Sequence, residues 1–260
     1  MPYRCWGQRM RTTRLFGKEI CAGDSRSLGR SLLQAMARGP KSAFFCNVHM
    51  LMLSREDAAL SAAMVSADMV FADGVPVAWL QRRTGTADAG VLRGYEALEM
   101  ICGEAARSGE KIGFFGSTEN VLSRLSDNLR QKFPSLKIGF VHSPGPVGES
   151  IRPEPDLISQ INAENLHALF IGLGCPRQEK WVATYAPHLN CNLLAVGAAF
   201  DWLAGTTRKP PDWMEKAGLA WFFRLMENPA KMWRRYMIYN TKFVLASLKL
   251  LTWDKWTSND

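Results

Sequence analysis

The stretch ALFIGLGCPRQEKWVATYAPHLNCNLLAVGAAFDWLAG, residues 168–205, decides the fold of this chain. It opens with a short apolar run, Ala168 to Gly172, passes through a glycine and proline turn, and has helix composition from Gln178 to Tyr185. A second apolar run, Leu193 to Val196, ends at Gly197. Two short buried strands joined by a helix form a βαβ unit, and such units belong to parallel sheets covered by helices.

The two glycine turns of this unit lie at the carboxyl ends of their strands, where open parallel sheets bind ligands. Gln178 and Glu179 begin the helix and are expected to point polar side chains into that crevice. The alternative is that the glycines and Pro176 only make a short turn, with Gln178 a solvated first-turn residue.

The same alternation of strand and helix runs through the preceding chain. Apolar runs predict strands at residues 15–20, 42–46, 69–72, 111–115 and 137–142, and helical patterns fall at 25–38, 55–66, 97–108, 120–132 and 155–164. Polar residues follow these strands and those of the βαβ unit: Asn47, His49, Asp73, Ser117, Gln178 and Asp201. The prediction is an α/β, Rossmann-like fold, a mostly parallel sheet with helices on both faces, whose rim gathers an active site.

Composition sets the tail of the chain apart. The formal charge is +8, and residues 206–260 hold ten Lys/Arg and five Asp/Glu, which is +5 of that total. We therefore expect a core at 1–205 and a C-terminal helical appendage at 206–260. The six cysteines form no metal-like spacing with the four histidines, so no metal site is expected. The basic N-terminus lacks the apolar segment of a secretory signal, and no run is long enough to span a membrane, so a cytosolic location is expected.

A helix is predicted from Lys231 to Leu251. On a helical wheel Lys231, Arg235, Lys242 and Lys249 fall on one stripe beside a broad aromatic and apolar side. This pattern suits a helix lying in an anionic membrane surface. A helix packed on the core with a solvated basic face explains the pattern equally well.

Four residues are chemical candidates, each with a structural alternative. Asp73 at a strand end could take a proton from an attacking hydroxyl, or could be a simple turn residue before Gly74. His49 could do the same work, or be a partly buried imidazole. Asp201 could cap the following helix, and Cys175 is better explained as a buried thiol than as a nucleophile.

Two common nucleotide-binding motifs are excluded or weak. The chain has no G-x-x-x-x-G-K-[ST] segment, which argues against a P-loop nucleotidase. Gly172-x-Gly174 begins like a dinucleotide fingerprint, but Arg177 stands where the third glycine is needed. A pyridine-nucleotide oxidoreductase is therefore a weak alternative.

Together these segments resemble the WecG/TagA/CpsF family of bacterial glycosyltransferases. The matching segments are 47–49, 72–74, the neighbourhood of Gly94, 116–117, 174–179, 196–197 with 200–201 and Gly205, Arg208 before Pro210, and 218–221 with 224–225. The combination of G-x-P-x-Q-E, D-G and G-L-x-W-x-x-R-L is what carries the resemblance. The family usually has arginine where this chain has Val91 and glutamate where it has Ala220, and arginine is frequent at the position of Lys231.

The resemblance implies an inverting enzyme, without metal or other cofactor, that moves a sugar from a UDP donor to a polyprenyl-diphosphate-linked sugar. Asp73 matches the proposed catalytic base, Asn47 a polar position beside the acceptor, and Gln178 the donor-binding glutamine. Arg224, Lys231 and Arg234 match basic positions of an appendage that touches the membrane and helps close the site over the diphosphate. The substrate-binding residues expected in all are Asn47, His49, Gly116, Gly174, Pro176, Gln178, Glu179, Gly197, Asp201, Arg208, Arg224, Lys231 and Arg234.

The segment Val75 to Trp79 resembles the exopolysaccharide branch, so the favoured reaction is transfer of glucose from UDP-glucose, giving a β-linked disaccharide. The alternatives are transfer of N-acetylmannosamine or its uronate within the same family, and a non-catalytic nucleotide-sugar-binding scaffold. The expected partners are the UDP-sugar, the lipid-linked acceptor and an anionic membrane surface, with no nucleic acid; a homo-oligomer is compatible with the sequence. The expected location is the cytoplasmic face of the bacterial inner membrane, as a peripheral protein.

Overall fold

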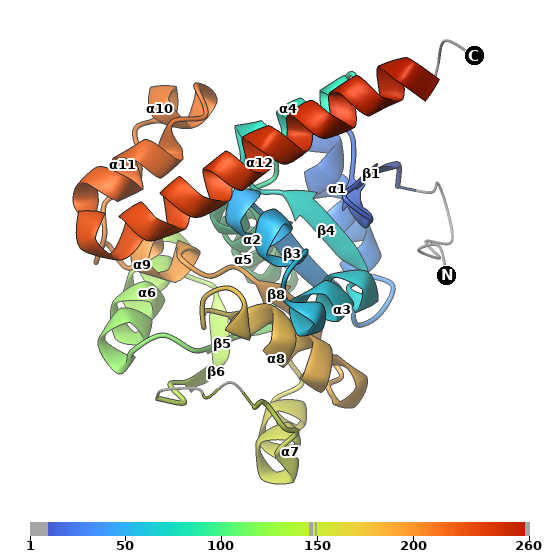
Figure 1. Ribbon diagram of the computed structural model, residues 1–260. Coiled ribbons are helices and arrows are strands. Elements are labelled where there is room, and N and C mark those ends of the chain that lie inside the picture. Colours follow the sequence, from blue (N-terminus) through green and yellow to red (C-terminus); the bar gives the residue numbers. More distant parts are fainter. Residues whose placement is uncertain (1–9, 146–147, 149, 258–260) are drawn as a thin grey trace.

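A computed structural model describes residues 10–145, 148 and 150–257 of the chain. Its centre is an eight-stranded sheet with the strand order β1-β2-β4-β3-β8-β7-β5-β6 (Figure 1). All neighbouring strands are parallel except β1 and β2, which form an antiparallel edge. The strands are β1 (Thr12–Leu15), β2 (Lys18–Cys21), β3 (Ser42–Cys46), β4 (Met69–Ala72), β5 (Lys111–Phe115), β6 (Lys137–His142), β7 (Ala168–Ile171) and β8 (Asn192–Ala195).

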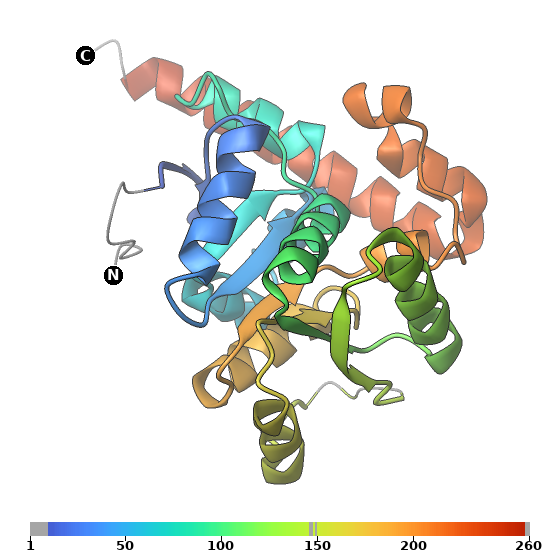
Figure 2. The same ribbon diagram turned by 180° about the vertical axis from the view of Figure 1, so that it is seen from behind.

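Helices cover both faces of the sheet, and each face has its own hydrophobic core. One face carries α2 (Val48–Leu53), α3 (Ala58–Ser66) and α8 (Arg177–Tyr185), which are in front in Figure 1. The other carries α1 (Ser25–Met36), α5 (Gly94–Ser108) and α6 (Glu119–Lys132), which come forward in Figure 2. The predicted fold class, a mostly parallel sheet with helices on both faces, is confirmed. The inner strands β3, β4, β7 and β8 are buried along their whole length, which explains their mostly apolar sequences.

The N-terminal edge differs from the sequence prediction. A single strand was expected over residues 15–20, but the chain forms a hairpin there, with β1 and β2 joined by Phe16 and Gly17. Both turn residues have positive φ, 47° and 78°, a conformation that glycine adopts freely and that closes two-residue hairpins. The pattern missed this turn because Phe16 continues the apolar run.

Two short helices that follow strands were also not predicted. Helix α2 begins directly after Asn47, and α4 (Val75–Arg83) begins directly after Gly74. The Asp73-Gly74 pair is therefore not a hairpin-type turn but a strand-to-helix junction. Both junctions lie at the carboxyl edge of the sheet, so both bring the start of a helix to the predicted rim.

The C-terminal segment is helical, and its helices pack on both faces of the sheet. It comprises α9 (Ala199–Leu203), α10 (Asp212–Lys216), α11 (Ala220–Glu227) and α12 (Pro229–Thr257), while α7 (Pro155–Ala163) and the 3-10 turn η1 (Ala186–His188) precede it. Helix α9 contacts α5 and α6, whereas α12 contacts α2. The long helix α12 crosses the molecule beside α2 and α4 (Figures 1 and 2). Among the described residues, no helix has the length and apolarity needed to cross a bilayer. The proposed division at residue 205 stays a prediction.

The helix predicted from Lys231 to Leu251 is confirmed as part of α12, but its protein-facing side differs from the predicted pattern. Arg235 lines a pocket of the protein, and Lys242 pairs with Glu56 and lies over the ring of Tyr239. Two residues of the predicted basic stripe, Arg235 and Lys242, therefore contact the protein, whereas Lys249 is exposed. Exposed apolar side chains occupy the outward side instead: Trp233, Met237, Ile238, Val244, Leu245 and Leu248. The wheel misplaced the faces because Tyr236 and Phe243, which are buried, were grouped with the outward residues.

Candidate active site

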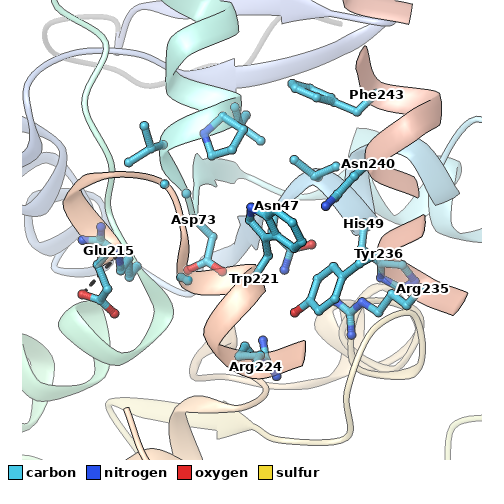
Figure 3. A pocket seen from close by; sticks show the side chains of 18 of the residues that line it. Asn47, His49, Asp73, Glu215, Trp221, Arg224, Arg235, Tyr236, Asn240 and Phe243 are labelled. Carbon is cyan, nitrogen blue, oxygen red and sulfur yellow. Dashed lines mark ion pairs between the residues drawn. The ribbon is translucent and has the colours of Figure 1, made fainter. Parts of the chain in front are cut away.

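Asp73 lies at the carboxyl end of β4, in the wall of a cavity of about 340 Å³ that we call the Asp73 pocket (Figure 3). Its backbone N–H donates to Cys46 O at 2.9 Å, which extends the pairing of β3 and β4 by one residue. Its side-chain Oδ1 accepts a hydrogen bond of 3.2 Å from the backbone N–H of Gly94, the first residue of α5. The carboxylate is thus fixed at a helix N-terminus, where negative charge is stabilised.

The pKa of Asp73 is raised to about 7, because burial penalises the carboxylate. The Gly94 N–H, Arg93 and Arg224 all favour the ionised form, but they do not fully offset burial. A carboxyl group with a pKa near neutrality is suited to accept a proton in catalysis, because the free base is then both available and basic enough. A carboxyl group that has a perturbed pKa and lies in a pocket is a candidate for a functional residue.

Asn47 lines the same pocket from the neighbouring strand end. Its Oδ1 accepts from Met50 N at 3.1 Å and so caps α2. No described residue takes the hydrogens of its Nδ2 amide, which is left to donate to a ligand. One side chain therefore both starts a helix and offers a hydrogen-bond donor beside Asp73.

Two arginines from the appendage supply positive charge to the pocket. Arg224 of α11 and Arg235 of α12 both line it, and no carboxylate among the described residues lies within 4.0 Å of either. The Nε of Arg235 is buried without a hydrogen-bond partner. Burial and repulsion from Arg224 lower the pKa of Arg235, which shows that the two cations act on each other. Two unpaired guanidinium groups in one cavity form a site for a dianionic group such as a diphosphate.

His49 stands beside these arginines and is neutral. Burial, Arg235 and Arg224 together lower its pKa to about 3, and its ring lies edge-on to Tyr239 at 4.7 Å. Its Nδ1 is buried without a partner. A neutral imidazole of such low basicity is a poor general base, so Asp73 is the better of the two candidates.

A second cavity, of about 460 Å³, adjoins the first and is called here the Asp201 cavity. It holds Asp201 and Arg208, which were both predicted, together with Thr206 and Thr207. Trp202 and Arg224 line both cavities, and the Arg224 guanidinium lies over the Trp202 ring at 5.5 Å. Arg224 therefore stands at the junction of two compartments.

A sequence model described as "Glycosyl transferase WecG/TagA/CpsF family" matches residues 13–257. The chain belongs to this family. Its match covers most of the described structure, including both cavities, and confirms the resemblance read from the motifs.

The names of individual relatives of the chain specify a reaction. A protein of Bacillus subtilis (strain 168) is 28% identical over 192 residues, covering 71% of this chain and 70% of the relative. Its name is N-acetylglucosaminyldiphosphoundecaprenol N-acetyl-beta-D-mannosaminyltransferase. Proteins with the same name occur in Bacillus spizizenii, at 28% identity over 190 residues (72% of this chain, 71% of the relative), and in Staphylococcus aureus (strain MW2), at 24% over 170 residues (65% and 63%).

The side chains of Gln178 and Glu179 are not placed as the sequence predicted. Both side chains are buried instead of reaching into the crevice. The Gln178 amide accepts from Gly174 N at 3.2 Å and donates to Ala195 O at 3.2 Å, which ties together the turns after β7 and β8. These backbone groups would otherwise be buried without partners, and this explains why the side chain turns inward. Gln178 is not in the wall of the Asp73 pocket.

Glu179 is a fully buried ionisable group. Its Oε1 accepts from Gln178 Nε2 at 2.8 Å, and burial raises its pKa to about 7. Cys175 and Arg235 both lower that pKa, so the tail helix is coupled electrostatically to this turn. Burial also raises the pKa of the Cys175 thiol, in agreement with the inert role preferred for it.

The predicted glycines bring backbone close to the rim. Gly174 and Gly197 have φ of 78° and 56°, and Gly116 has φ of 102°. A Cβ on Gly116 would meet Gly172 backbone atoms at 2.9 Å, so only glycine lets these two turns touch. Pro176 follows a cis peptide bond in the turn before α8. The binding roles of these residues stay predictions.

The remaining predicted residues are Arg234 and Lys231, both on α12. Arg234 is exposed and does not line the Asp73 pocket. The side chain of Lys231 lies outside the described part of the structure. Arg235, one position further, is the residue that reaches the site.

Sequence reasoning missed several residues of the pocket: Arg93, Glu215, Trp221, Tyr236 and Phe243. Arg93 and Glu215 are paired, with Nε and Oε2 3.8 Å apart, and Tyr95 Oη donates to Glu215 at 2.9 Å. They supply an arginine and a glutamate to the pocket, which Ala220 also lines. The appendage residues could not be placed from the sequence, because helical periodicity does not show which side faces the core.

The described residues contain no group of three or more His, Cys, Asp or Glu side chains suited to hold a metal ion. The positive charge of the site comes from the arginines instead. The expectation of a cofactor-free enzyme stays a prediction.

Proposed function

We propose that this glycosyltransferase moves N-acetylmannosamine from UDP-N-acetylmannosamine onto N-acetylglucosamine that is linked through diphosphate to a polyprenol. The observation that carries the chemistry is an Asp73 carboxyl with a pKa of about 7 in one pocket with two unpaired arginines. The acceptor and donor sugars are drawn from the names of the relatives.

In this proposal the Asp73 carboxylate accepts the proton of the attacking acceptor hydroxyl. The hydroxyl oxygen bonds to the anomeric carbon of the donor as the bond from that carbon to the diphosphate oxygen breaks. UDP leaves with the electron pair, and Arg224 and Arg235 stabilise its growing negative charge. Asn47 Nδ2 orients the acceptor beside the base.

The two cavities divide the substrates in the proposal. The nucleotide portion of the donor occupies the Asp201 cavity, and its diphosphate lies at Arg224, which lines both cavities. The acceptor sugar occupies the Asp73 pocket. This division accounts for Asp201 and Arg208 in the substrate set without requiring Gln178 to contact the donor.

The acceptor is anchored in a membrane, and we propose that the outward side of α12 docks on the bilayer surface. Met237 and Leu248, exposed by 63% and 56%, belong to this apolar side. Such a helix lies in the interface without crossing it. The enzyme would then act as a peripheral protein at the cytoplasmic face of the membrane.

Glucose, the donor sugar favoured by residues 75–79, is less well supported. Val75, Pro76 and Val77 form apolar wall in the Asp73 pocket, and their side chains offer no hydrogen bonds to distinguish one hexose from another. The relatives favour the N-acetylmannosaminyl alternative.

The test is a donor panel. UDP-N-acetylmannosamine, its uronate and UDP-glucose are each incubated with N-acetylglucosaminyl diphosphoryl farnesol, and the disaccharide product is measured. Preferred use of UDP-N-acetylmannosamine is expected. Preferred use of UDP-glucose would overturn the donor assignment, and nucleotide binding without transfer from any donor would favour a non-catalytic scaffold.

A further inference from the structure

The Asp73 pocket is charged at one end and apolar at the other. Arg224 and Arg235 lie at the charged end, and Phe243 lies at the opposite end, with Asp73, Asn47 and Trp221 between them (Figure 3). Phe243 comes eight positions after Arg235 on α12, and eight positions span about 12 Å along a helix axis. The pocket is therefore long compared with a single sugar ring.

Two helices build the apolar end. Val75, Pro76 and Val77 come from the first turn of α4, and Phe243 and Val244 come from α12. None of these five side chains carries a charge or a hydrogen-bonding group. Phe243 is 6% exposed, whereas Val244 is 54% exposed, so the wall runs from the interior to the surface.

This wall continues into the exposed apolar side of α12. Leu245 and Leu248, the neighbours of Val244 along that helix, are exposed, as is Trp79 on α4. An apolar path thus leads from beside Asp73, between α4 and α12, to the surface proposed to meet the membrane. A water-soluble substrate alone would not require such a path.

We propose that the space between α4 and α12 holds the first isoprene units of the acceptor lipid. This inference rests on the proposed function, because the lipid is that of the proposed acceptor. With the donor at the Arg224 end and the acceptor sugar at Asp73, the acceptor diphosphate lies beside Asn240 and the N-terminus of α4, which both line the pocket, and the lipid chain leaves by the other end. Isoprene units match that end in polarity, and a charged or sugar-like group does not.

The test measures binding rather than turnover. N-acetylglucosaminyl diphosphates carrying one, two or three isoprene units are titrated into the protein while tryptophan fluorescence is followed. Affinity is expected to rise at least about tenfold from one to three units. Because no donor is present, an incorrect donor assignment does not affect the result.

Two variants locate the binding region. Val244→Glu places a charge in the wall and is expected to abolish most of the gain with chain length. Leu248→Glu, an equally exposed position one turn further on α12 and outside the pocket, is expected to keep the gain. Equal affinity for all three ligands, or no binding of any of them, would overturn the inference. It would also be overturned if the Val244→Glu protein kept the gain with chain length, or if both variants lost that gain equally. Binding that follows the expected pattern while no donor is transferred would instead refute the proposed function alone.

Discussion

At the scale of single residues, Asp73, the proposed catalytic base, is expected to cost stability when it is ionised. Its pKa is about 7 in the fold against an ordinary 3.8, so the fold holds the proton more tightly than the unfolded chain does. The stabilising effect of the protonated group is complete below about pH 4 and is lost as pH rises to about 7. Above that pH the folded protein carries a destabilising buried charge.

Replacing Asp73 by asparagine is therefore expected to stabilise the protein at pH 8. Asn retains an oxygen that can accept from Gly94 N–H but has no charge to desolvate. The free energy of unfolding should rise on the order of 2 kcal/mol at pH 8, and the gain should shrink at pH 5. Urea denaturation at both pH values measures it. A gain of the same size at both would show that ionisation of Asp73 is not its cause.

Asn47 has a structural role as the cap of α2 and a proposed binding role, and substitution can separate the two. Asn47→Asp keeps an oxygen to cap α2, so stability should stay within about 0.5 kcal/mol, whereas Asn47→Ala should lose about 1 kcal/mol. Both remove the Nδ2 donor, and the aspartate also places a like charge near Asp73. Activity should fall at least about tenfold in both. An active, stable Asn47→Asp enzyme would refute the donor role.

Arg235 and Arg234 are neighbours in sequence that the structure separates. Arg235→Gln should weaken the binding of UDP by about tenfold or more, because a charge-assisted contact with phosphate oxygens is lost. Arg234→Gln should have a smaller effect, since Arg234 is exposed outside the pocket. Calorimetric titration compares the two. A larger loss for Arg234→Gln would show that the resemblance identified the binding residue better than the geometry does.

At the scale of elements, α12 packs on the protein along one side and is exposed along the other. Its inward side packs on α2 and supplies Arg235, Tyr236 and Phe243 to the pocket. Its outward side is apolar as well. The sequence pattern was ambiguous for this reason, because a helix with apolar residues on both sides has no single stripe that marks the core.

The outward side of α12 is expected to bind membranes. Met237→Glu should reduce sedimentation with vesicles containing anionic lipid by several-fold, because it places a charge in the buried part of the interface. Val65→Glu on α3 is the matched control, since Val65 and Met237 are both 63% exposed and lie on different helices. Equal loss in both variants, or no loss in Met237→Glu, would contradict this docking surface.

At the scale of the whole molecule, the sheet and the long C-terminal helix were readable from the sequence, whereas the packing of the appendage on the core was not. Strands buried on both faces give continuous apolar runs, and β3, β4, β5, β7 and β8 were located on that basis. The edge strand β6 was also located, although it is only half-buried. The β1–β2 hairpin was missed because Phe16 hides its turn. Helices α2 and α4 were missed because each is short and follows a strand directly.

Some residues of the candidate site could likewise be located from the sequence, and others could not. Asn47 and Asp73 were found because a parallel sheet brings strand ends to one edge. Gln178 was placed in the crevice on the same rule, but the need to satisfy two buried turns draws it inward. Arg235 and Phe243 depend on how the appendage packs, which local patterns do not encode.

The most direct test of the central claim is the pH dependence of sugar transfer by the enzyme and its Asp73→Asn variant. With N-acetylglucosaminyl diphosphoryl farnesol as acceptor, kcat/KM of the unaltered enzyme should rise with pH and level off above about 7, as the Asp73 carboxylate forms. The variant should be slower by a factor of about 100 to 10,000 and lack this rise. Undiminished transfer by Asp73→Asn would contradict the account.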